Sequence, residues 1–69
     1  MNAERFRAAI RARMELCGVP DLKTLAEHTS TSYKTFLYEW KHPELFRAAT
    51  LKEIFDYLTM SAAERGELI

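Results

Sequence analysis

The side chains that most often carry out enzyme and metal chemistry are few in this sequence, and they lie far apart. His28 and His42 are separated by fourteen positions, and the one cysteine, Cys17, falls on an apolar stripe. A zinc site uses about four closely placed ligands, so we expect no metal and assign Cys17 to the core. Glu39 and Glu44 flank His42, but a chain this short has no room for a catalytic cleft around them.

Motifs for phosphate binding and nucleophilic catalysis are also missing. With only two glycines, the chain has neither a glycine-rich phosphate loop nor a dinucleotide-binding fingerprint. No serine, histidine and aspartate form a recognisable catalytic set. We therefore predict a binding protein that is not an enzyme and uses no cofactor.

The distribution of charge favours an anionic partner for part of the surface. Ten lysines and arginines balance ten acidic residues, so no large field of one sign is expected. Residues 1–14 carry four arginines against one glutamate, a net charge of +3, and residues 22–43 carry three lysines against two glutamates, a net of +1. The first two-thirds of the chain is the better candidate for contact with an anion.

Length and composition favour one globular domain over residues 1–69. The hydrophobic fraction is 48% and the charged fraction 29%, which excludes disordered, collagen-like and linker-like classes. A single cysteine excludes an internal disulfide. No apolar run resembles a signal peptide or approaches the roughly 20 residues of a membrane helix, so we expect a cytoplasmic protein.

Apolar spacing predicts an all-α fold of four to five short helices. The first spans about 3–17 and ends at Gly18, before Pro20. Asp21 can cap a second, which ends near His28 or Thr29. The apolar stripes of these two helices are Phe6, Ile10, Met14 and Cys17, then Leu22, Leu25 and Ala26.

Polar breaks and caps divide the rest of the chain. Thr31 or Ser32 can cap a third helix over 33–41, which His42-Pro43 ends. Residues 44–49 are ambiguous, with a helical turn as one interpretation. Thr50 is expected to cap a fourth helix, and Ser61, three residues before Glu64, a fifth over about 62–68. The inward residues of the third and fourth helices are Phe36 and Trp40, then Leu51, Ile54, Phe55 and Leu58.

Two short helices joined by a tight turn, the second with a polar outer face, are typical of a helix-turn-helix. Over roughly residues 6–65 the sequence resembles the phage-repressor and Cro-type (XRE-like) helix-turn-helix family. Leu25-Ala26-Glu27 matches the family's first motif helix, and Ser32, Thr35 and Phe36 match the start of its recognition helix. From Leu25 to Leu58 the spacing matches the family without insertion or deletion. The resemblance implies a lambda-repressor-like DNA-binding domain with the motif at about 22–41.

Three positions depart from the family pattern. Thr29-Ser30-Thr31 replaces an apolar residue, a glycine and a second apolar residue at the turn. Glu39 stands where an aliphatic side chain is usually buried, and the neighbouring Trp40 can supply that packing. Leu22 stands where a phosphate-binding glutamine is common.

The resemblance implies that the third helix lies in the major groove of an operator in double-stranded DNA. Lys34 would donate to guanine O6 and N7, and Leu37 would contact a thymine methyl group. Phosphate contacts are expected from the start of the second helix, where N–H groups are exposed. The residues expected to contact DNA are Lys23, Thr24, Ser32, Tyr33, Lys34, Leu37, Tyr38 and Lys41.

Other interpretations of these surfaces stay open. Tyr33, Leu37 and Tyr38 also suit a protein partner, as in an antirepressor or inhibitor built on the same fold. The arginines of the first helix are expected on a solvated helix face, with phosphate contact by Arg5 or Arg7 as the alternative. The segment after Met60 is a candidate homodimer interface, since little chain remains to bury Leu68 and Ile69, and a frayed tail is equally compatible.

Overall fold

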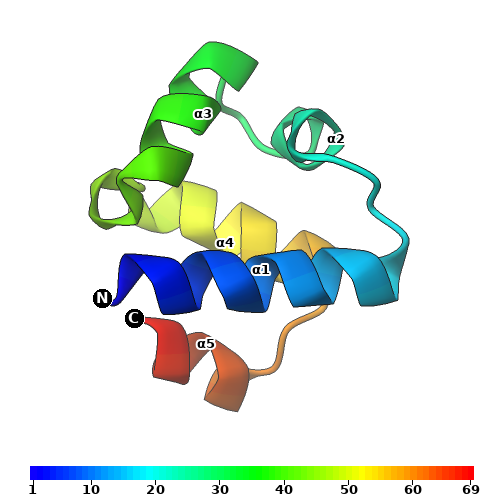
Figure 1. Cartoon of the computed structure of the whole chain (residues 1–69), viewed down its shortest axis with the longest axis vertical. Helices are drawn as coiled ribbons and strands as arrows, with labels where there is room; N and C mark the ends of the chain where they lie inside the picture. Colours follow the sequence, from blue (N-terminus) through cyan, green and yellow to red (C-terminus); the bar gives the residue numbers. More distant parts are fainter.

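A computed structural model describes residues 1–69 and confirms an all-α fold (Figure 1). α2 and α3 lie on one side of the layer formed by α1 and α4, and α5 lies on the opposite side (Figure 1). The elements are α1 (Ala3–Cys17), α2 (Leu22–Glu27), α3 (Tyr33–Lys41), the 3-10 helix η1 (Pro43–Leu45), α4 (Ala48–Tyr57) and α5 (Ala62–Leu68).

The first helix forms where its apolar spacing predicts. Asn2 caps it by accepting from the backbone N–H of Arg5 at 3.0 Å, and Gly18 ends it at a positive φ of 71°, which glycine adopts without a steric penalty. The placement of Cys17 in the core was wrong: this residue is exposed, and its Sγ lies 3.5 Å from the carbonyl oxygen of Leu58. The stripe therefore turns out of the core after Met14, in the last turn of α1.

The expected cap of α4 was also wrong. Arg47 is the N-cap, without a side-chain bond, and the helix begins at Ala48. Thr50 is instead buried inside the first turn, because its hydroxyl group is used in a contact with Thr31, 3.3 Å away. The segment before α4, left ambiguous by the sequence, contains η1.

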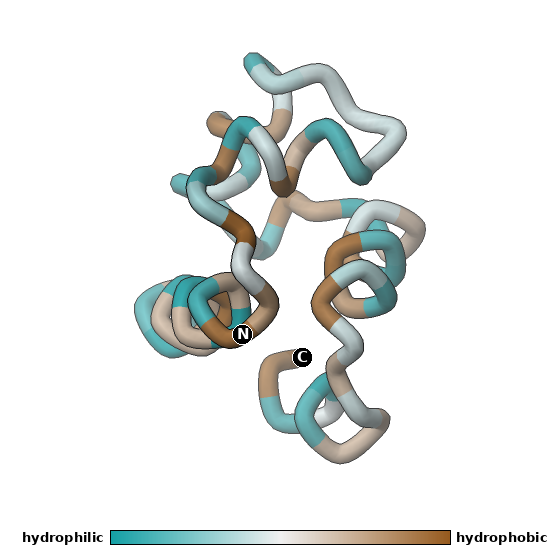
Figure 2. Tube along the Cα trace, turned by 90° about the vertical axis from the view of Figure 1, so that its right-hand side faces the viewer, coloured by the Kyte–Doolittle hydropathy of each residue, from teal (hydrophilic) through white to brown (hydrophobic).

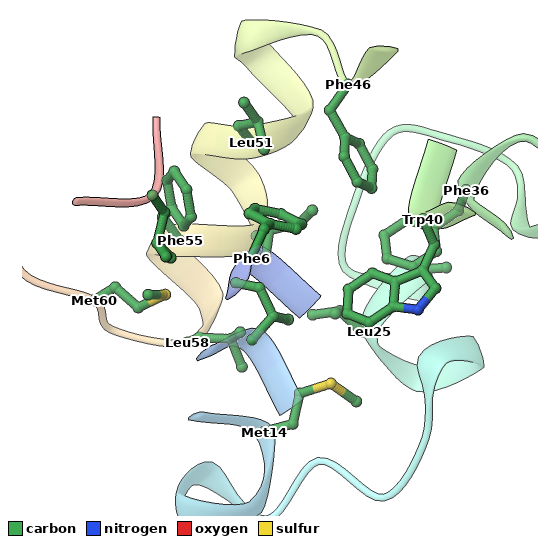
Figure 3. Close-up of a cluster of buried hydrophobic side chains, with 14 of the residues drawn as sticks. Phe6, Met14, Leu25, Phe36, Trp40, Phe46, Leu51, Phe55, Leu58 and Met60 are labelled. Carbon is green, nitrogen blue, oxygen red and sulfur yellow. The ribbon is translucent and has the colours of Figure 1, made fainter. Parts of the chain in front are cut away.

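Fifteen apolar side chains form one core between the helices. Figure 2 colours the backbone trace by hydropathy, and Figure 3 shows most of the core side chains as sticks. Phe6, Ile10, Leu25, Phe36, Ile54 and Leu58 are completely inaccessible to solvent. Phe6 is central, with ring centroids 6.1 Å from Trp40 and 5.8 Å from Phe46. The core thus joins α1, α3, α4 and the segment after η1.

The last helix confirms the predicted capping box. The Ser61 hydroxyl accepts from the N–H of Glu64, and the Glu64 carboxylate accepts from the N–H of Ser61. Leu68 was expected to lack internal packing, but it is buried at 7% exposure, because α5 folds back under the core, whereas Ile69 is 70% exposed. None of the helices has the length and apolarity needed to cross a membrane.

Thr59 is the one residue other than glycine with a positive φ, 53°. A β-branched residue is strained there by about 1–2 kcal/mol. We predict that Thr59→Gly raises the free energy of unfolding by roughly 0.5–1 kcal/mol, after the entropy of the freer unfolded chain is subtracted. Gly18→Ala, at φ 71°, should lower it by about 1 kcal/mol. Urea denaturation measures both, and a destabilised Thr59→Gly variant would contradict the strain.

Asp56 should make stability depend on pH. Its carboxylate accepts from Lys52 Nζ at 2.7 Å and lies 2.8 Å from Arg65, and these contacts lower its pKa. A lowered pKa in the folded state stabilises the protein at neutral pH, and this contribution is lost as pH falls below about 4. We predict that Asp56→Asn is less stable than wild type at pH 7 and that the difference vanishes in acid. A difference independent of pH, measured by urea denaturation, would refute this.

Candidate functional site

The pair α2 and α3, with residues 28–32 between them, presents the surface that the sequence singles out. Asp21 caps α2 by accepting from the N–H of Thr24 at 2.8 Å, and Ser32 caps α3 by accepting from the N–H of Thr35 at 3.3 Å. Both helices therefore begin at caps that the sequence predicts.

The turn between them reaches its shape without glycine. None of its residues has a positive φ, so the missing glycine produces no backbone strain there. Instead, the Thr29 hydroxyl donates to the carbonyl of Ala26 at 2.8 Å and accepts from the N–H of Thr31 at 3.3 Å. Side-chain bonds of this kind let threonine replace glycine in a turn.

One face of α4 holds this turn in place. The Glu53 carboxylate accepts from both the N–H and the hydroxyl of Ser30, at 3.2 and 2.8 Å. Four residues further along α4, Tyr57 stacks on His28 with ring centroids 3.7 Å apart and an angle of 12° between the rings. Together with the contact between Thr31 and Thr50, these interactions hold the turn against α4.

The inner face of α3 is aromatic. Phe36 and Trp40 are buried, and Phe36 packs edge-on against Phe46 at 5.6 Å (Figure 3). Glu39 is also buried, at 7% exposure, and its Oε1 has no hydrogen-bond partner. Trp40, the next residue, is buried as well, so the burial of Trp40 does not bring Glu39 to the surface.

The outer face of α3 carries Lys34, Tyr38 and Lys41, at helical spacings of four and three. All three are exposed, and neither lysine forms an ion pair. Tyr33 is 43% exposed at the start of the helix. Leu37 is only half-buried rather than fully outward, so it lies on the flank of this stripe.

The start of α2 differs from the expected phosphate site in one respect. Lys23 is exposed, but the N–H and hydroxyl of Thr24 both donate to Asp21 Oδ1. These two bonds lower the pKa of Asp21, which keeps a negative charge at this helix end. Ser32 is similarly engaged, because its hydroxyl donates to the Thr35 hydroxyl.

Two exposed residues, Thr35 and Arg47, were not among the expected DNA contacts. Thr35 follows Lys34 on α3, and Arg47 precedes α4 and forms no ion pair. The position of Thr35, three residues after the predicted cap Ser32, could have indicated their contact, in which the Ser32 hydroxyl donates to the Thr35 hydroxyl at 3.1 Å. Arg47 lies in the segment whose structure the spacing left ambiguous.

The arginines of α1 are engaged with other parts of the fold. Arg5 pairs with Glu67 at 3.8 Å, Arg13 donates to the carbonyls of Leu58 and Thr59 at 2.9 Å, and Arg11 lies over the Trp40 ring. Arg7 contacts the end of α3.

The outer face of α3 lines none of the three surface hollows, the largest of which is about 420 Å³ and lies beside Met14 and Val19. No three His, Cys, Asp or Glu side chains converge to hold a metal ion. Comparisons with family models, curated proteins and solved structures found nothing that matches the chain.

The bonds between Ser30 and Glu53 predict energetic coupling. We expect Glu53→Ala and Ser30→Ala each to lower the free energy of unfolding by about 0.5–1.5 kcal/mol, and the double variant to lower it by less than the sum. A control cycle pairs Glu53→Ala with Lys34→Ala, which should be additive. Additive effects for Ser30 and Glu53 would show that the turn is held by other contacts.

Proposed function

We propose that the chain is a DNA-binding transcriptional regulator, in which α2 and α3 form a helix-turn-helix and α3 enters the major groove. The observation that carries this proposal is the exposed, unpaired stripe of Lys34, Tyr38 and Lys41 on a helix whose opposite face is fixed in the core. An α-helix about 10–12 Å across fits a major groove about 12 Å wide.

Local charge supports DNA contact although the chain has no net charge. Glu39 is the one acidic residue of α3, and its burial keeps it off the outer face. The lysines therefore face solvent without an acidic neighbour on their own helix. When unpaired lysines neutralise DNA phosphates, the cations condensed on the DNA are released. This release supplies most of the affinity of non-specific binding.

Within this proposal the outward residues have different roles. Lys34, near the start of α3, reaches base edges, where it donates to guanine. Tyr38 and Lys41, further along the same stripe, contact the phosphate backbone, as Lys23 does from α2. Leu37, on the flank, contacts a thymine methyl group, and the hydroxyl of Tyr33 donates to a base or phosphate.

Specific binding by a module this small calls for two copies on one operator. Single modules bury about 600–1,000 Å², so we propose a homodimer that binds two half-sites and acts by operator occupancy, as a Cro-like repressor in the cytoplasm of a bacterial cell. Exposed Ile69 lines an apolar hollow with Ala48, Leu51 and Phe55. This hollow is the proposed contact between copies.

The same face offers an alternative partner. Tyr38 is 59% exposed, Tyr33 at the start of α3 is 43% exposed, and Leu37 is half-buried beside them. Tyrosine and large apolar side chains supply contact area in protein interfaces. Capture of a protein by this face, without any affinity for DNA, would identify an antirepressor or inhibitor.

Lys34→Ala tests the DNA proposal. We expect wild type to bind duplex DNA with an affinity that falls steeply between about 50 and 200 mM salt. On a selected site, Lys34→Ala should bind about tenfold more weakly and lose preference at one base pair. The matched control is Lys52→Ala, an exposed lysine on α4 paired with Asp56, which should bind within about twofold of wild type. Fluorescence anisotropy measures all three, and no binding at low salt would overturn the proposal.

A further inference from the structure

The end of α3 leaves two carbonyl groups without backbone partners. The last carbonyls of any helix lack intrahelical donors, and Pro43 has no N–H to offer. The N–H of His42 bonds to Tyr38 and Glu39 instead, and that of Leu45 bonds to His42. The carbonyls of Trp40 and Lys41 therefore accept no backbone N–H, and a side chain or solvent can supply the donor.

Arg7 supplies that donor from α1. Its Nη1 donates to the Trp40 carbonyl at 3.2 Å and lies 3.4 Å from the Lys41 carbonyl. Arg7 forms no ion pair with any carboxylate, so these carbonyls are the polar protein partners of its guanidinium group. A cation at the C-terminal end of a helix also interacts favourably with the helix dipole.

The same end of α3 is held by two further contacts from α1. The Phe6 ring packs on Trp40, with centroids 6.1 Å apart, and the Arg11 guanidinium lies 5.4 Å above the Trp40 ring. Three residues of α1 thus contact Trp40, two through its ring and Arg7 through its backbone. Since Lys41 and Tyr38 lie in this last turn, its orientation determines where their side chains point.

We propose that Arg7 is a positioning residue, which fixes the C-terminal turn of α3 for DNA binding and does not itself contact a phosphate. This inference rests on the proposed function. The Arg7 guanidinium then has a structural role in the fold, and the phosphate contacts come from the lysines of α2 and α3.

Arg7→Gln separates positioning from phosphate contact. We expect DNA affinity to fall about tenfold while the slope of log K against log salt keeps its wild-type value, because no phosphate contact is lost. Amide hydrogen exchange at His42, whose N–H closes the last turn of α3, should become faster. The matched control is Arg5→Gln, which removes the same charge from the same helix but touches Glu67 rather than α3. It should leave both affinity and exchange unchanged.

Each outcome decides the inference. A slope reduced by about one, with unchanged exchange at His42, would make Arg7 a phosphate contact and overturn it. Unchanged affinity would overturn it as well. If Arg7→Gln does not fold, Arg7→Lys keeps the charge and a donor, and should show weaker binding with the wild-type slope. If wild type binds no duplex, the proposed function fails, and exchange at His42 alone decides whether Arg7 holds α3.

Discussion

The packing of Phe36 and Trp40 against Phe6 and Phe46 is the constraint on which the arrangement of the other elements depends. Two aromatic side chains four residues apart define one face of α3 and bury it against α1 and the segment after η1. A helix anchored along one face presents the opposite one to solvent. Lys34, Tyr38 and Lys41 are therefore exposed because the opposite face of α3 is packed in the core. This packing fixes the direction of the three side chains in the unbound protein.

Polar contacts at helix ends complement this small core. A domain of this length buries only about 60% of its unfolded surface, so bonds that join separate elements matter for a unique structure. Arg7 and Arg13 of α1 reach the C-terminal carbonyls of α3 and α4, and Glu53 of α4 reaches the turn before α3. These contacts restrict the motion of α3 relative to α1 and α4. A helix held in this way would lose little entropy on binding, which favours affinity.

Contacts close in sequence were predictable, and those between distant segments were not. The spacing of Phe6, Ile10 and Met14, and caps such as Ser61 with Glu64, involve residues within one or two helical turns. Cys17, Thr50 and Leu68 were misplaced because their environments depend on other helices. Likewise, nothing in the sequence links Arg7 to Trp40, thirty-three positions away, so the outward stripe of α3 was predictable but the contacts that orient it were not.

The central claim is that the outer face of α3 is the surface that meets DNA. Chemical-shift mapping by NMR tests it most directly, because a chain of 8.0 kDa gives a resolved spectrum and every backbone amide except those of the two prolines reports on its own surroundings. On titration with a selected duplex, the account predicts that the largest shifts fall on Tyr33–Lys41 and the start of α2. Shifts confined to α4 and α5, or no shifts at low salt, would contradict it.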